Sequence, residues 1–205
     1  VPVPRYAVTT SLSCDGNLNT FRYLEKKKGV PFTFLDVPYG DDEASVEYLA
    51  GQLKDFVREL ENQFGKTFDE EKLKKALEIE NETRKELVHF FRLQSEYYYP
   101  GELISHLYMM MGMHLLIGTQ DFLDLIRFMV KDIQTYPKFE GKKILWVHLL
   151  PFYQESLREY FNESEKYQII ASDIIIDSME ELDASRPFHA LAKKIIHNLY
   201  NGSYD

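Results

Sequence analysis

The first forty residues alternate between short apolar runs and one amphipathic segment. Residues 5–12 and 31–37 are rich in β-branched and aromatic side chains, which favours strands. Between them, residues 18–28 repeat apolar positions at helical spacing and end in three lysines before a glycine. Short connections and the order strand, helix, strand predict a right-handed βαβ unit with parallel strands.

From about residue 41 to about residue 136 the apolar positions recur with the helical period of 3.6. Four amphipathic helices are predicted here: one from Asp41 or Asp42 to Gly65, one after a Thr67-x-x-Glu70 capping box, one from Gly101 to Ile117, and one capped near Thr119. So much helix is too long for a simple crossover. It predicts a helical subdomain between two α/β segments.

The strand and helix signals return after this region. Residues 143–149 and 167–171 predict strands, residues 152–162 predict a helix between them, and residues 187–200 predict a final helix with proline at its start. The second βαβ pattern repeats the topology of the first without repeating its sequence.

The predicted fold class is therefore α/β, with two partial Rossmann-like parallel-sheet segments separated by a helical subdomain. Residues 1–40 would be the C-terminal part of a first α/β domain, 41–138 the helical subdomain, and 139–205 the N-terminal part of a second α/β domain. Neither α/β segment has the five or six strands of an average sheet. We expect the remaining strands to lie in a longer protein of which this chain is a piece.

Composition narrows the function classes. The 205 residues are 44% apolar, enough for a proper core, and 24 Lys and Arg against 33 Asp and Glu give a net charge of −9. That charge repels phosphate backbones and anionic lipid, so neither nucleic acid nor a membrane surface is an expected partner. The sequence has no apolar run long enough to cross a membrane and no signal-peptide pattern, which predicts a cytoplasmic protein.

Cys14, the single cysteine, is the first candidate for chemistry. It follows a predicted strand and precedes a predicted helix, which places it at the carboxyl edge of a parallel sheet, where open α/β folds bind ligands. A helix N-terminus favours the thiolate, a soft ligand suited to zinc, copper or an iron–sulfur cluster. One thiolate holds none of these alone, so other ligands would be needed. The alternative is a buried cysteine without a role.

The remaining candidates favour structural interpretations. The pairs His106 and His114, and His189 and His197, are each eight residues apart rather than the four of a two-histidine metal face, and His148 ends a strand. Residues 108–113 are methionine-rich core or interface, or else a soft ligand pocket. Residues 97–101 are a packed interhelical corner, or else line a coenzyme A groove. The acidic residues 41–43 suit a helix start rather than a metal site. Phosphate-loop, dinucleotide and serine-hydrolase motifs are missing from the sequence.

Several short motifs together resemble the 2-hydroxyacyl-CoA dehydratase family, whose D-component subunits are related to benzoyl-CoA reductase subunits. They follow in the family's order and spacing over nearly the whole chain: Leu12-Ser-Cys-Asp-Gly-Asn17, Gly29-Val-Pro31, Leu35-Asp-Val-Pro38, Tyr48-Leu49, Leu60-Glu61, Phe64-Gly65, Leu73 and Asn81-x-x-Arg84. Family members are longer and carry further cysteines before and after the part that this chain matches. Many also have a glycine-containing turn after the strand at 143–149, where this chain has His148.

The resemblance implies a function that the residues alone do not. In the family, cysteines ligate a 4Fe-4S cluster, and Cys14 corresponds to the second of them, so it is the expected cofactor-binding and metal ligand. An ATP-dependent activator would deliver one electron, a ketyl radical of the acyl-CoA thioester would form, and water would leave from carbon 2 in anaerobic metabolism. The implied partners are an acyl-CoA substrate, a homologous second subunit and the activator.

Two alternatives stay open. The chain is a non-catalytic assembly module of the same fold, or it is part of a long homologue fused to an activator-like domain. As an isolated piece it is expected to be inactive as a dehydratase and to bind no stable cluster.

Overall fold

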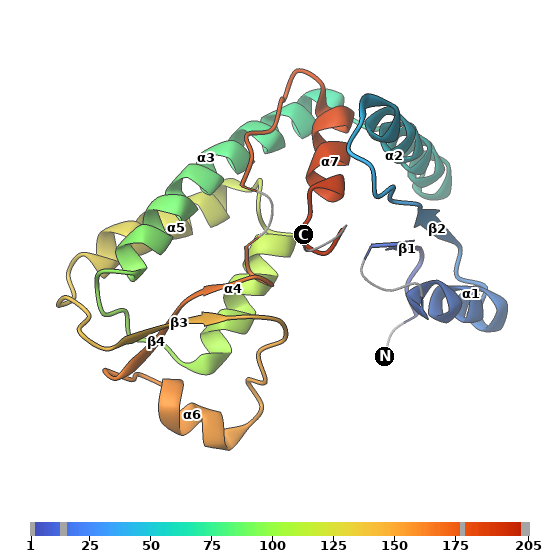
Figure 1. Cartoon of the computed structure of the whole chain (residues 1–205). Coiled ribbons are helices and arrows are strands. Elements are labelled where there is room, and N and C mark those ends of the chain that lie inside the picture. Colours follow the sequence, from blue (N-terminus) through green and yellow to red (C-terminus); the bar gives the residue numbers. More distant parts are fainter. Residues whose placement is uncertain (1–2, 13–15, 177–178, 202–205) are drawn as a thin grey trace. The chain divides into compact units, whose positions relative to one another are not determined.

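A computed structural model describes residues 3–12, 16–176 and 179–201 and shows an α/β fold with two small parallel sheets (Figure 1). The predicted fold class is confirmed. The chain forms two compact units: residues 1–71 together with 182–205, and residues 72–181. Cys14 lies outside the described residues.

The first unit contains the N-terminal βαβ motif and two further helices. Its elements are β1 (Ala7–Thr10), α1 (Gly16–Lys28), β2 (Phe32–Leu35), α2 (Glu43–Phe64) and α7 (Pro187–Ile196). β1 and β2 pair in parallel, with Ala7 opposite Phe32 and Thr10 opposite Leu35, as the sequence predicts. Helix α1 makes the crossover and packs Phe21 against Phe32, with ring centroids 6.3 Å apart.

Local signals set both ends of α2. Asp42 is the N-cap, and its carboxylate accepts a 2.7 Å hydrogen bond from the backbone N–H of Ser45. These bonds to Ser45 hold the pKa of Asp42 below its usual value. Gly65 ends the helix in the left-handed conformation, at φ 62°, which glycine adopts without steric cost. The acidic residues at 41–43 therefore begin a helix, as predicted.

Helix α2 packs against α7, which returns to it from the other end of the chain (Figure 1). Val46, Leu49 and Ala50 of α2 are almost fully buried, as are Ala192 and Ile196 of α7. This core joins segments more than a hundred residues apart in sequence.

The second unit holds the other helices and the second sheet. Its elements are α3 (Glu70–Gln94, of which the first two residues belong to the first unit), α4 (Leu103–Leu115), α5 (Gln120–Ile133), β3 (Lys142–Trp146), α6 (Glu155–Phe161) and β4 (Tyr167–Ser172). Its main core joins Leu87 and Phe90 of α3 with Met113 of α4 and Ile126 of α5. Thr119 caps α5 by accepting from the N–H of Phe122, as predicted.

Strands β3 and β4 also run parallel, with Lys142 opposite Tyr167 and a register shift after Ile144. A smaller core of Leu103, Leu150 and Ile169 lies against one face of this sheet, with Ile144 and Trp146 packed onto it. The second predicted βαβ unit is therefore present, with α6 as its helix.

Several predicted element ends are wrong, among them the start of α6, which begins at Glu155 rather than at residue 152. Helix α3 begins at Glu70 itself, so Thr67 is not its N-cap and the predicted capping box does not form. Strand β3 stops at Trp146 because the chain turns at His148, whose φ is 72°. Helix α7 stops at Ile196 rather than near Tyr200.

Packing groups the elements differently from the three sequential segments. Helix α2 lies with the first sheet and α7, whereas β3 and β4 lie with α3, α4 and α5. The boundaries at residues 40 and 138 concern the domains of a longer protein and stay a prediction. Across the part of the chain that the structure describes, no helix combines the length and apolarity needed to span a membrane.

Candidate functional site

The described residues on both sides of Cys14 belong to the carboxyl edge of the first sheet. β1 ends at Thr10 and α1 begins at Gly16. Beyond the last strand pair, the backbone N–H of Val37 donates to the Ser11 hydroxyl at 2.8 Å, and that hydroxyl donates to the Val37 carbonyl at 3.4 Å. The carboxyl ends of β1 and β2 are thereby fastened together. The position of Cys14 itself at this edge stays a prediction.

The donor chemistry of the chain fits one ligand of an iron–sulfur cluster. A cluster of this kind is held by soft thiolates, and the sequence supplies one, at Cys14. Within residues 3–12, 16–176 and 179–201, one group of three or more metal-ligating side chains comes together, and it contains only carboxylates and a histidine. The described residues therefore add no soft ligand to Cys14.

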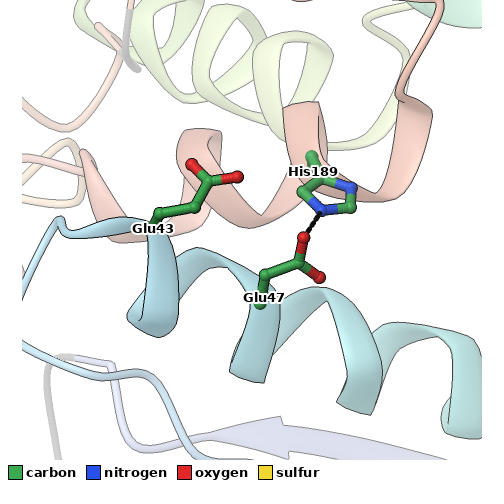
Figure 2. Close-up of side chains that lie close together, drawn as sticks. All are labelled: Glu43, Glu47 and His189. Atoms are coloured by element: carbon green, nitrogen blue, oxygen red, sulfur yellow. Dashed lines mark hydrogen bonds and ion pairs between the residues drawn. The ribbon is translucent and has the colours of Figure 1, made fainter.

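That group consists of Glu43, Glu47 and His189, whose candidate ligand atoms lie within 4.8 Å of one another. Figure 2 shows both glutamates projecting from α2 toward the histidine on α7. His189 Nε2 is 2.6 Å from a carboxylate oxygen of Glu47. The hydrogen bond with His189 is the main reason that the pKa of Glu47 is lowered. The sequence did not predict this pairing, because 142 residues separate its partners.

A cation is already present beside these carboxylates. Arg186 Nη2 lies 3.3 Å from a carboxylate oxygen of Glu43 and 3.6 Å from one of Glu47. A metal ion would have to displace this guanidinium from the two carboxylates. Both carboxylates are exposed, so water solvates them well and reduces what they would gain by binding a metal ion. The cluster is best described as a set of polar contacts that links α2 to α7 within the first unit.

The histidines of α4 do not form a metal site. His114 Nε2 lies 2.9 Å from the backbone carbonyl oxygen of Ile174. His106 lines a cavity of about 300 Å³ in the second unit. Burial lowers the pKa of His106 to about 4, so its imidazole is neutral near pH 7.

This buried imidazole predicts a loss of stability in mild acid. Unfolded histidine titrates near about 6.5, so below that pH the unfolded chain binds a proton that the folded chain does not take up until about pH 4. The free energy of unfolding should therefore fall as pH drops from about 6.5 toward 4. Replacing His106 with glutamine should flatten this part of the profile, measured by urea unfolding at several pH values. An unchanged slope in the variant would contradict the assignment.

The tyrosines at residues 97–101 form the predicted interhelical corner. Tyr98 donates its backbone N–H to Pro137, at 2.9 Å, and stacks on Phe139 at a centroid distance of 6.4 Å. The ring of Tyr99 makes edge contacts with Phe90 and Tyr136. Burial, and then Asp132, raise the pKa of Tyr99 to about 12. The rings are packed as an interhelical corner, and Tyr99, Pro100 and Gly101 also line a cavity of about 300 Å³.

The methionine-rich segment of α4 divides between two environments. Met113 is almost fully buried in the main core, and Met109 and Met110 pack against that core. Tyr108 and Met111 are exposed. The prediction that this segment belongs to the core is therefore confirmed for the side of α4 that carries Met109, Met110 and Met113.

The carboxyl end of β3 carries an unusual backbone conformation at His148. Its φ of 72° lies in the left-handed region, and its N–H donates to the Asp173 carboxylate at 2.8 Å. Left-handed backbone costs a residue with a Cβ about 1 kcal/mol or more. The family's glycine-containing turn would meet this demand without that cost.

Replacing His148 with glycine should therefore raise the free energy of unfolding by up to about 1 kcal/mol, despite the greater entropy of the unfolded chain. Val147→Gly is the matched control, because Val147 is not among the described residues with positive φ. It should lower stability by about 0.5–1 kcal/mol. Chemical denaturation of both variants measures the difference. Equal destabilisation by the two glycines would contradict the interpretation.

The Asn81-x-x-Arg84 motif contributes a buried ion pair. Arg84 and Glu80 are 3% and 5% exposed. One carboxylate oxygen of Glu80 accepts from Arg84 Nε at 3.0 Å and from Nη2 at 2.5 Å, and Nη1 donates to the Glu180 carbonyl at 3.2 Å. Because its guanidinium is buried and bonded within the protein, Arg84 has a structural role in the second unit.

Comparison with known proteins identifies the family. The sequence profile of the 2-hydroxyglutaryl-CoA dehydratase, D-component family matches residues 4–203. The chain belongs to this family. The dehydratase resemblance drawn from the short motifs is thereby confirmed.

Curated dehydratase subunits are among the relatives of this D-component chain. The alpha subunit of (R)-phenyllactyl-CoA dehydratase from Clostridium sporogenes is 21% identical, over 90% of this chain and 50% of its own length. The beta subunit of the same enzyme is 28% identical, over 95% of this chain and 52% of its own length. The alpha subunit of (R)-2-hydroxyglutaryl-CoA dehydratase from Acidaminococcus fermentans is 28% identical over 42% of this chain. The chain thus spans about half the length of the two phenyllactyl-CoA dehydratase subunits.

Proposed function

We propose that this chain is part of a subunit of a 2-hydroxyacyl-CoA dehydratase that contains an iron–sulfur cluster. The observation that carries the proposal is the match of the dehydratase D-component family to residues 4–203, which includes the β1–α1 connection with Cys14. The relatives whose names state a substrate act on phenyllactyl-CoA and 2-hydroxyglutaryl-CoA. The proposed substrate class is accordingly a 2-hydroxyacyl-CoA thioester.

Cys14 would supply one thiolate ligand to a 4Fe-4S cluster. When bound, such a cluster supplies a single low-potential electron for the dehydration. The chain's own contribution is to hold the thiolate on a βαβ unit whose strand ends are joined through Ser11 and Val37. The other ligands would come from outside this chain.

The proposed partners are a homologous second subunit and an ATP-dependent activator. The relatives from Clostridium sporogenes are named as alpha and beta subunits of one enzyme, and this chain is similar to both. That dual similarity supports a pair of related subunits. An activator fits the proposed chemistry because the electron must be driven to low potential by an energy source.

An anaerobic dehydration assay tests the proposal. The polypeptide that contains this chain would be isolated without oxygen together with the proteins that copurify with it. It would then be supplied with a reductant, ATP, the activator fraction and (R)-phenyllactyl-CoA or (R)-2-hydroxyglutaryl-CoA. Formation of the corresponding enoyl-CoA, detected by mass spectrometry, is the expected result. An assembly that carries no iron and dehydrates neither thioester would overturn the proposal and favour the assembly module.

A further inference from the structure

The second unit contains the cavity that His106 lines, with a volume of about 300 Å³. It lies between the ends of α3 and α4 and one side of β4. This volume is at the lower end of the range for small-molecule sites, so it suits a compact ligand rather than a whole nucleotide.

Part of the cavity wall is aromatic or thioether. Phe90 and Phe91 from α3, Met109 from α4, Met129 from α5 and Phe161 from α6 all line it. Rings and methionine sulfur pack well against a flat or branched apolar group. The wall therefore favours a ligand with an apolar body.

Two polar groups at the cavity have no hydrogen bond among the described residues. Ser172, at the end of β4, is 1% exposed, and its buried hydroxyl is without a partner. His106 makes no described hydrogen bond, and its neutral ring can both donate and accept. An unsatisfied buried polar group is unfavourable, and a hydrogen bond from or to a ligand oxygen would satisfy it.

The other polar side chain on the β4 wall is already occupied. Gln168 accepts from the N–H of Tyr99 at 2.9 Å and donates to the carbonyls of Gln94, at 2.7 Å, and Tyr97, at 2.9 Å. These bonds fix one wall of the cavity, so its shape does not depend on a ligand. Among the other polar residues that line the cavity, His106 and the buried Ser172 are the two that we assign to ligand recognition.

The charges around the cavity argue against an anionic ligand. Glu102 is the one charged residue among the described residues that line it, and no lysine or arginine does so. A carboxylate or phosphate would lose its hydration here and meet a neutral imidazole instead of a cation. An uncharged ligand does not incur that cost.

We propose that this cavity binds an uncharged molecule that has an aromatic or branched apolar body and one carbonyl or hydroxyl oxygen directed at His106 and Ser172. The proposal goes beyond the dehydratase function and does not depend on Cys14. A negative dehydration assay would not contradict the proposed ligand site. Likewise, a failure of the cavity to bind such a molecule would not contradict the proposed dehydratase function.

Methionine methyl groups give a direct test, because the chain has six methionines and only Met109 and Met129 are among the residues lining this cavity. The 205-residue chain with ¹³C-labelled methionine methyls would be titrated with 3-phenylpropanamide and separately with 3-phenylpropanoate, at pH 7. The amide should shift Met109 and Met129 saturably and leave the exposed Met111 unchanged. The carboxylate, which has the same skeleton and a negative charge, should bind at least tenfold more weakly.

Variants separate the polar contacts from the apolar ones. Ser172→Ala and His106→Phe should each weaken the amide about three- to tenfold, since each removes one hydrogen bond. Both should bind propylbenzene, which has no polar atom, as well as the parent chain does. Met111→Ala is the control on α4 outside the cavity and should change neither affinity. The absence of saturable shifts in the parent chain, or binding of the carboxylate as tight as that of the amide, would overturn the proposal.

Discussion

Replacing Cys14 with serine should abolish the dehydratase activity of the assembled enzyme, with a loss of at least about a hundredfold. Changes to residues that hydrogen-bond to metal ligands already cost about 10- to 100-fold, and this change would remove a proposed direct ligand. Serine offers a hard oxygen of similar size, which iron–sulfur clusters accept poorly. The measurement is the rate of enoyl-CoA formation under anaerobic conditions, together with the iron and sulfide content of the protein.

The control variant is Tyr23→Phe, which changes an exposed side chain on α1, close to Cys14 in sequence. It should keep both the iron content and the rate. The isolated 205-residue chain should take up no stable cluster from iron and sulfide, because it has a single thiolate. If Cys14→Ser retains full iron and full activity, Cys14 is not a ligand, even where the enzyme proves to be a dehydratase.

Replacing Arg84 with alanine should lower the free energy of unfolding by about 3–5 kcal/mol, the usual cost of removing one member of a buried ion pair. The variant leaves the Glu80 carboxylate 5% exposed and without the two bonds that Arg84 supplies. It also removes the donor to the Glu180 carbonyl, which ties α3 to the segment after β4. Urea unfolding followed by circular dichroism measures the effect.

The adjacent Lys85 is a matched control. Its ion pair with Glu181 is 3.5 Å long, and both side chains are about 70% exposed. Lys85→Ala should therefore change stability by no more than about 0.5 kcal/mol. The double variant Glu80→Gln, Arg84→Met, which removes both charges, should cost less than Arg84→Ala alone. A loss below about 1 kcal/mol for Arg84→Ala would show that the pair is not buried as the structure has it.

Much of the local structure could be predicted from the sequence because its signals act over a few residues. Asp42 and Gly65 bound α2, Thr119 caps α5, and both parallel strand pairs follow from runs of β-branched residues beside short loops. The dehydratase resemblance depended on the same kind of information, since short motifs in a fixed order survive at about 20–30% identity. The predicted start of α3 at Thr67 and the predicted end of β3 beyond Trp146 were wrong.

The sequence alone determined the α/β class, most of the helices and the family, because periodicity, caps and motif order are properties of neighbouring residues. The tertiary structure decided what each polar side chain meets. Glu47 faces His189 across 142 residues, Arg84 reaches the Glu180 carbonyl across 96, and Ser172 is buried without a partner beside a cavity. Such contacts depend on how distant segments pack, and no local pattern specifies which distant partner a side chain will find.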